Sequence, residues 1–144
     1  MLKALVHMRD ENYKDAIEQL ENILRTCTVS PTGRMSILLN LGNAYYRIGQ
    51  SQMALRNCDA VLNLAPRVNK ADMLRGKSTA LANIGQVYMV KGNPDKALKY
   101  HHEALKIARK IGYRRREAAT LGNIGLVYSN KGARAIWTYC EKKM

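Results

Sequence analysis

The chain has 144 residues, of which 24 are Lys or Arg and 11 are Asp or Glu, giving a formal net charge of +13. Hydrophobic residues make up 47% of the sequence, and no apolar run approaches the roughly 18–20 residues that a membrane helix needs. These figures exclude a disordered or membrane-spanning chain and predict a single globular domain. The three cysteines are widely spaced, which argues against a disulfide framework, so we expect a cytoplasmic protein.

The charge is unevenly distributed along the chain. Residues 1–21 carry five acidic and three basic side chains, whereas residues 22–144 carry 21 basic and six acidic ones. A strongly positive surface attracts acidic partners and raises the rate at which they encounter the protein. We therefore expect a partner with an acidic segment.

Hydrophobic periodicity and capping residues predict eight helices in chain order. The first is only about eight residues long and is followed by a longer one. Ser30-Pro31 begins the third helix, Pro66 closes the fourth and Asn93-Pro94 begins the sixth. The expected helices span about 2–9, 12–26, 31–48, 51–64, 69–91, 94–111, 113–131 and 134–143.

A seven-residue pattern, x-Asn-(Leu/Ile)-Gly-x-x-Tyr, occurs three times, at residues 39–45, 82–88 and 122–128. The glycine within each copy falls on the same helix face as the neighbouring apolar residues, at positions 42, 85 and 125. Because a glycine inside a helix costs up to about 1 kcal/mol relative to alanine, we expect a second helix to approach closely at each one. A further glycine follows each tyrosine by four residues and is expected to end the helix. These helix-ending glycines are Gly49, Gly92 and Gly132.

The repeated unit is therefore a pair of helices joined by a glycine turn, and its residues resemble the tetratricopeptide repeat family. The family pattern of apolar-Gly-x-x-Tyr, turn Gly, Ala and closing Pro is met by Leu41, Gly42, Tyr45, Gly49, Ala54 and Pro66. Residues 97–112 are similar to the second helix of a longer-repeat subclass found in spindle-orientation scaffolds, kinesin light chains and prokaryotic repeat proteins.

The resemblance implies an all-α, right-handed superhelical solenoid of antiparallel helix hairpins, with about 3.5 repeats in one domain. It also implies a protein–protein interaction module that binds an extended or short helical peptide in its concave groove. Both terminal units depart from the pattern. The expected units span about 1–30, 31–68, 69–112 and 113–144.

Asparagines recur at the position that lies on or near the concave wall in this family. An Asn side chain both donates and accepts hydrogen bonds, so it can hold the backbone of an extended peptide; alternatively, the three amides tie one repeat to the next. The clamp that chaperone-binding members use for a C-terminal carboxylate is incomplete, because Leu39, Ala82 and Gly122 stand where lysines are expected. We expect a neutral-polar groove with Arg47 as its main cation. The candidate peptide-binding residues are Asn40, Asn43, Tyr46, Arg47, Thr79, Asn83, Gln86 and Asn123.

Enzymatic chemistry has little support in the sequence. His101 and Cys58 occupy second-helix positions that face the hairpin core, and the adjacent His101 and His102 point to different faces of a helix. No metal-spaced Cys/His cluster and no phosphate-binding loop is present. We expect no enzyme, no cofactor, no metal and no catalytic residue.

Two alternatives to the peptide groove remain open. The basic run Arg114, Arg115 and Arg116 could dock an acidic partner or nucleic acid. RNA binding would need aromatic residues among the basic ones to stack bases; Tyr100 and Tyr113 are nearby, but we expect Tyr100 to pack inside the hairpin. Alternatively, exposed terminal hairpins pair with another copy or with further repeats, so the protein is a self-associating structural element. We favour a protein partner over nucleic acid and expect no membrane association.

Overall fold

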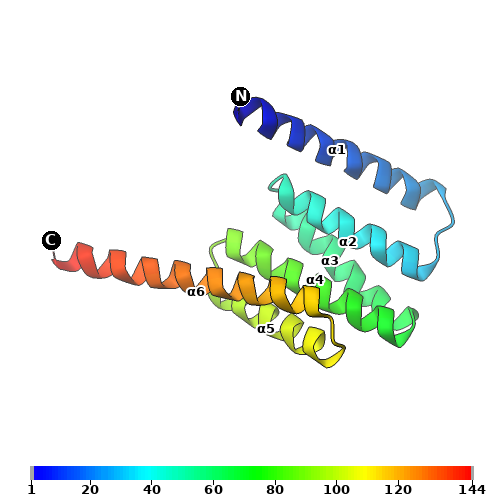
Figure 1. Ribbon diagram of the computed structural model, residues 1–144. Helices are drawn as coiled ribbons and strands as arrows, with labels where there is room; N and C mark the ends of the chain where they lie inside the picture. Colours follow the sequence, from blue (N-terminus) through cyan, green and yellow to red (C-terminus); the bar gives the residue numbers. More distant parts are fainter. Residues whose placement is uncertain (1, 144) are drawn as a thin grey trace.

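The computed structural model describes the backbone of residues 2–143 and the side chains of residues 11–142. This part of the chain forms helices and no strand, so the expected all-α class is confirmed (Figure 1). Consecutive helices pack side by side along the stack. The helices are α1 (Leu2–Thr26), α2 (Pro31–Arg47), α3 (Ser51–Leu64), α4 (Lys70–Val90), α5 (Pro94–Lys110) and α6 (Arg114–Lys143), with a short 3-10 turn, η1 (Ala65–Arg67), after α3.

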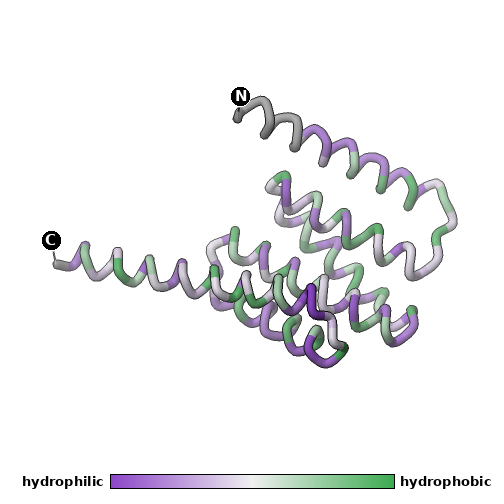
Figure 2. The backbone as a smooth tube through the Cα atoms, in the orientation of Figure 1, coloured by the Kyte–Doolittle hydropathy of each residue, from purple (hydrophilic) through white to green (hydrophobic). Residues whose placement is uncertain are grey.

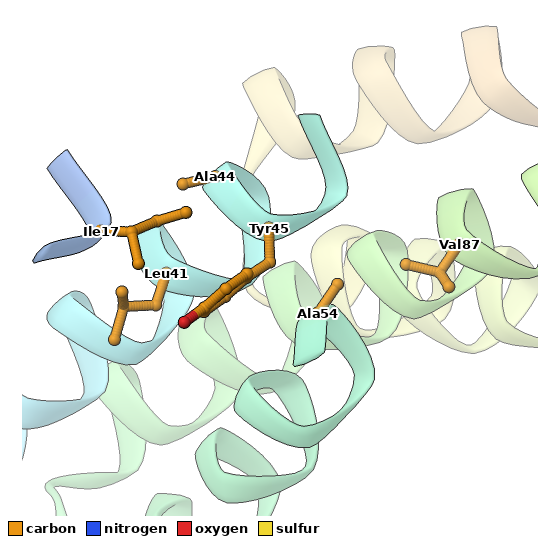
Figure 3. Packing of buried hydrophobic residues seen from close by; sticks show 6 residues of the cluster. All are labelled: Ile17, Leu41, Ala44, Tyr45, Ala54 and Val87. Atoms are coloured by element: carbon orange, nitrogen blue, oxygen red, sulfur yellow. The ribbon is translucent and has the colours of Figure 1, made fainter. Parts of the chain in front are cut away.

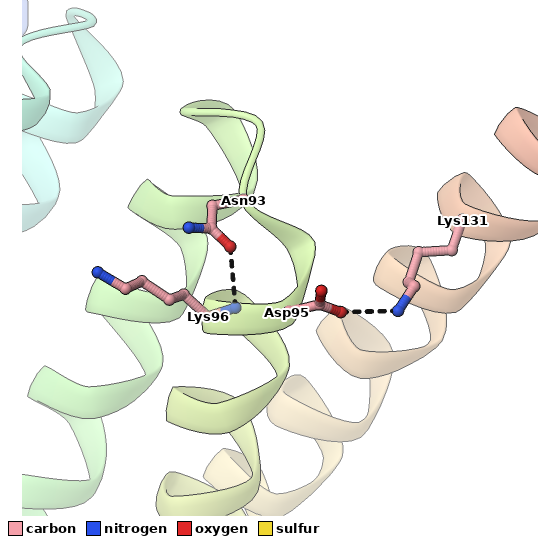
Figure 4. A network of polar contacts seen from close by, with 4 residues as sticks. All are labelled: Asn93, Asp95, Lys96 and Lys131. Atoms are coloured by element: carbon pink, nitrogen blue, oxygen red, sulfur yellow. Dashed lines mark hydrogen bonds and ion pairs between the residues drawn. The ribbon is translucent and has the colours of Figure 1, made fainter.

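Two hairpins, α2/α3 and α4/α5, form the centre of the stack. Their turns contain Gly49 and Gly92, whose φ angles of 80° and 79° lie in the left-handed region that favours glycine. The second helix of each pair begins directly after its turn, and Asn93 caps α5 by accepting a hydrogen bond from the backbone N–H of Lys96 at 3.2 Å (Figure 4). The expected turn glycines are therefore confirmed in both central units, and the expected cap is confirmed for α5. The expected N-cap at Ser51 is wrong, because Ser51 is the first residue of α3 and Gln50 before it makes no side-chain cap.

The core is divided among neighbouring helices and has no single centre. One cluster joins α1, α2, α3 and α4 (Figure 3). A second joins α2, α3 and α4, and a third lies between α4 and α5. Such a serial arrangement is typical of helical repeats, in which each unit is stabilised mainly by its neighbours. The buried residues of the first cluster are Ile17, Leu41, Ala44, Tyr45, Ala54 and Val87.

The glycines inside the first helices allow close helix contact in the two hairpins. A Cβ at Gly42 would lie 3.1 Å from the Cys58 Sγ, and a Cβ at Gly85 would lie 2.7 Å from the His101 ring. The expected close approach is thus confirmed at both positions. At Gly125 it is wrong, because no atom lies within 4 Å of the place where a Cβ would be.

The sequence predicts a helix break in each terminal unit, and both predictions are wrong. The first helix runs from Leu2 to Thr26 without interruption, because the polar residues near position 11 include neither a glycine nor a proline. The last runs from Arg114 to Lys143 through Gly132, which has no left-handed φ. No N-cap follows Gly132: the next residues are Ala133, Arg134 and Ala135, which favour a continuing helix.

The α6 helix therefore packs on the body along its first part and then projects beyond it. Its first part contacts α5 and α4, while the C-terminal part extends past the other helices (Figure 1). Two exposed ion pairs join α6 to α5: Arg109–Glu117 at 3.1 Å and Asp95–Lys131 at 2.8 Å (Figure 4). No helix in the described residues has the length and apolarity required to cross a bilayer.

Candidate binding groove

The first helix of each unit faces the same hollow. The α2 and α4 helices lie side by side, and α6 lies against α4, so that the three together line a hollow of about 360 Å³. Tyr113, directly before α6, completes the wall. The lining residues are Thr32, Met35, Ser36, Leu39 and Asn40 from α2, Asp72, Arg75, Gly76 and Thr79 from α4, then Tyr113 and Arg116.

Gly76 and Met35 close the floor of the hollow. A Cβ at Gly76 would lie 2.5 Å from the Met35 Sδ, so the glycine is what lets this buried methionine pack against α4. The neighbouring Leu39 adds a half-buried apolar side chain to the α2 wall. The floor is therefore apolar, and polar groups stand around it.

Two arginines make the hollow positive. The Arg75 guanidinium lies 5.3 Å from the centre of the Tyr113 ring, a cation–π distance that holds the side chain over the wall. The Arg116 Nε is buried and has no hydrogen-bond partner among the described residues. The acidic group nearby, Asp72, accepts a hydrogen bond from the Asn69 side chain at 2.7 Å. A buried guanidinium N–H without an acceptor is unfavourable, so this position suits an incoming oxygen.

The structure brings together some of the residues predicted from the sequence and leaves others outside the hollow. Asn40 and Thr79 both line it. The Thr79 hydroxyl donates to the backbone carbonyl of Arg75 at 3.0 Å, which leaves its oxygen free to accept. The predicted residues that belong to the same helices but do not line the hollow are Asn43, Tyr46, Arg47, Asn83, Gln86 and Asn123.

The cations of the hollow differ from the expected one. Arg47, predicted as the main cation, is exposed in the last turn of α2 and does not line the hollow, whereas Arg75 and Arg116 do. Arg75 falls four residues before Thr79, one helical turn away on the same face, and this spacing is the signal that could have revealed it.

The three arginines at the start of α6 do not lie on one face of the helix. Arg116 lines the hollow, whereas Arg114 and Arg115 are exposed elsewhere. Successive residues of a helix point in directions about 100° apart, so three in a row do not share one face.

The three asparagines are accessible to a ligand. Asn40 is exposed, and Asn83 and Asn123 are half-buried. Within residues 11–142, no hydrogen bond joins any of these three side-chain amides to another residue. The alternative in which they tie repeats together therefore has no support from the described contacts.

The titratable groups with shifted pKa values lie in the packing and not in the hollow. Burial, with a smaller effect from His102, lowers the pKa of His101 to about 4, and burial with a smaller effect from Asp59 raises the pKa of Cys58 to about 12. Burial and a hydrogen bond donated to Glu21 raise the pKa of Tyr45 to about 12. Among the described residues, no group of three His, Cys, Asp or Glu side chains could hold a metal ion.

Two comparisons with known proteins bear on the family of this chain. A family model for the tetratricopeptide repeat matches residues 77–134, which comprise most of α4, all of α5 and the first part of α6. The chain is also 33% identical over 103 residues to outer dynein arm-docking complex subunit 4 of Xenopus laevis. That alignment covers 69% of this chain and 19% of the relative, so the chain spans about a fifth of the protein it matches.

Proposed function

We propose that this chain captures an acidic peptide segment in the hollow between α2, α4 and α6. The premise is the match of residues 77–134 to the tetratricopeptide repeat, a family whose members generally act as non-enzymatic scaffolds for protein–protein interaction. In this proposal an acidic side chain enters the hollow beside Asn40, while the peptide backbone continues past Asn83 and Asn123, which lie outside the hollow on α4 and α6.

The observation that carries the proposal is the buried Arg116 Nε, which has no acceptor among the described residues. A carboxylate oxygen supplies that acceptor, and the neighbouring Arg75 supplies a second positive charge at the same hollow. Hydrogen bonds between a guanidinium and a carboxylate are about twice as strong as neutral ones. An acidic side chain is therefore the group that best matches the site.

The surrounding residues suit a peptide better than a free anion. Met35 and Leu39 offer apolar contact beside the arginines, and Asn40 offers an amide that can pair with a peptide group. Asn83 and Asn123 provide accessible amides on α4 and α6. The net charge of +13 steers an acidic segment toward the protein.

The test compares peptides and variants that differ by one charge. An array of peptides about ten residues long, containing Asp and Glu or the matched Asn and Gln, is probed with the wild-type chain. The hits are then measured by fluorescence anisotropy against Arg116→Gln and, as the matched control, Arg115→Gln. We expect Arg116→Gln to lower the affinity for acidic peptides about 10-fold or more, and Arg115→Gln to change that affinity about 2-fold or less.

Two results would contradict the proposal. One is equal binding of acidic and amide peptides, and the other is an equal effect of the two arginine variants. Replacing Asn40, Asn83 and Asn123 together by alanine separately tests their contact with the peptide backbone. This variant should bind peptides more weakly while circular dichroism shows unchanged helix content.

We further propose that the chain works as an adaptor within a protein assembly. The Xenopus laevis relative is named as a docking-complex subunit, and that name supports an adaptor role by analogy. A cytoplasmic setting is part of this proposal, supported by the free thiols of Cys27, Cys58 and Cys140. The alternative of a nucleic-acid surface at Arg114–Arg116 has less support, because these side chains point in different directions.

A further inference from the structure

Most of the large apolar side chains that remain exposed in the described residues belong to α6. They are Leu121, Leu126, Tyr128, Ile136, Trp137 and Tyr139, whereas the rest of the described chain contributes Ile23 and Val90. Several of them fall on one line along the helix, at alternating steps of three and four residues. We call this line the α6 stripe; it consists of Ala118, Leu121, Gly125, Tyr128, Gly132, Ala135 and Tyr139, all of which are exposed.

The internal repeats show what normally covers the first part of this stripe. In the hairpins, the equivalent faces of α2 and α4 are covered by α3 and α5, whose Cys58 and His101 lie against the helix glycines. Leu81, the counterpart of Leu121, is 4% exposed, whereas Leu121 is 44% exposed. The first part of the stripe therefore has the form of a helix-binding face without its helix.

The chain contains a segment equivalent to the missing helix. Residues 133–143 follow Gly132 as α3 follows Gly49 and α5 follows Gly92. Instead of turning back, this segment continues α6 in a straight line away from the body (Figure 1), and Figure 2 shows hydrophobic positions recurring along it. Both halves of a hairpin contact are thus present and exposed, as in an opened hairpin.

We propose that two copies of the chain pair through antiparallel α6 helices, so that residues 133–143 of each copy cover residues 118–128 of the other. Pairing of the same helix from two copies forms a closed two-fold dimer, in which each copy supplies the helix that the other copy's exposed face lacks.

The order of large and small residues in the stripe favours the antiparallel direction. A two-fold axis near residue 130 places Tyr128 against Gly132 of the second copy and Gly125 against Ala135 of the second copy. Each tyrosine then faces a glycine, and two helices can approach to about 8–10 Å. A parallel pair would set Tyr128 against Tyr128 and Gly125 against Gly125, which leaves a clash beside a gap.

The size and charge of the contact set its strength. Residues 118–139 span about 30 Å at about 1.5 Å per residue, which makes an interface at the small end of specific contacts, below about 1,200 Å² in total. We therefore expect dissociation in the micromolar range. Because each copy carries a net charge of +13, the copies repel one another, so added salt should tighten the dimer. Added salt should weaken the binding of an acidic peptide in the hollow. The opposite salt dependence therefore distinguishes peptide binding from dimer formation.

The first test is the mass of the full chain between about 1 and 100 μM by sedimentation equilibrium, a range that brackets micromolar affinity. The wild-type mass should rise from 16.2 kDa toward twice that value. Tyr128→Glu should stay monomeric, whereas Leu126→Glu, a change at a position that is 62% exposed but outside the stripe, should behave like wild type. A wild-type monomer at every concentration, or a dimer that Tyr128→Glu leaves intact, overturns the proposal.

The second test measures the direction of pairing. Cys140 is exposed and Cys58 is fully buried, so a Cys27→Ser chain takes a nitroxide label at Cys140 alone. The antiparallel dimer places the two labelled positions about 30 Å apart, whereas a parallel dimer places them about 10 Å apart. A short distance in double electron–electron resonance overturns the antiparallel exchange even where the mass is that of a dimer.

Discussion

Replacing Gly85 with alanine should destabilise the protein, whereas the same change at Gly125 should stabilise it. The two glycines occupy equivalent positions in adjacent repeats, so the stabilisation of the helix backbone on replacing glycine with alanine is the same at both. Alanine in a helix interior is favoured over glycine by about 1 kcal/mol. The two sites differ only in what the new methyl group meets.

At Gly85 the new Cβ would lie 2.7–2.9 Å from three atoms of the His101 ring. His101 is 1% exposed, so the ring has no room to move aside and the helices must separate. Overpacking of this kind costs about 1–3 kcal/mol, which offsets or exceeds the backbone gain. At Gly125 no atom lies within 4 Å of the new Cβ, so only the stabilisation of the helix backbone remains. The two variants should therefore differ by about 1–3 kcal/mol in the free energy of unfolding.

The assay is urea denaturation followed by circular dichroism, at protein concentrations low enough to keep the chain monomeric. Gly125→Ala should raise the free energy of unfolding by about 1 kcal/mol. A Gly85→Ala variant in the His101→Cys background, which reproduces the Gly42–Cys58 pair, should recover part of the loss. Equal changes at Gly85 and Gly125 would refute the account of the glycines as helix-contact positions.

Acidification should destabilise the protein through His101, because the folded-state pKa of about 4 lies below the ordinary value of 6.5 and protonation favours the unfolded chain. This contribution is complete above about pH 6.5 and is lost as the pH falls toward 4, and the loss has reached about 2 kcal/mol at pH 5. Denaturation of wild type beside His101→Cys measures it, and identical pH profiles would contradict it. Gly92→Ala should cost about 1–2 kcal/mol because its φ of 79° is left-handed, whereas Gly132→Ala should stabilise the continuous α6 by about 1 kcal/mol. Thermal melts of the two variants give opposite shifts if this holds, and a destabilised Gly132→Ala would show that a turn forms there in solution.

The central repeats could be predicted closely from the sequence because their signals are local and redundant. Gly49 and Gly92 stand after periodic helices, and Asn93-Pro94 supplies an independent start signal for the next helix. Position 132 carries the same glycine but lacks that second signal. A glycine alone ends a helix less reliably than a glycine followed by a cap, which is why the C-terminal break was wrong.

The lining of the hollow could be predicted only in part from the sequence, because the hollow depends on how three helices meet. Asn40 and Thr79 follow from repeat register. Arg75 lies within residues 67–77, which account for the step of 43 residues from Gly42 to Gly85 against 40 from Gly85 to Gly125, so it has no counterpart to align with. In the sequence, Arg116 is the last of three consecutive arginines and nothing distinguishes it from the other two. Its place in the hollow depends on the angle at which α6 crosses α4, which the local sequence does not encode.

The division of the core among neighbouring helices also governs how the protein loses its structure. The α4 helix contacts α2, α3, α5 and α6, whereas α1 packs on α2 and the far end of α6 extends past the body. Amide hydrogens at both ends of the stack should exchange with solvent sooner than those of α4, because opening an end breaks contacts with fewer neighbouring helices than opening α4 does. A ligand that touches α2, α4 and α6 together would join units that otherwise open one at a time, so the exchange pattern would report its binding.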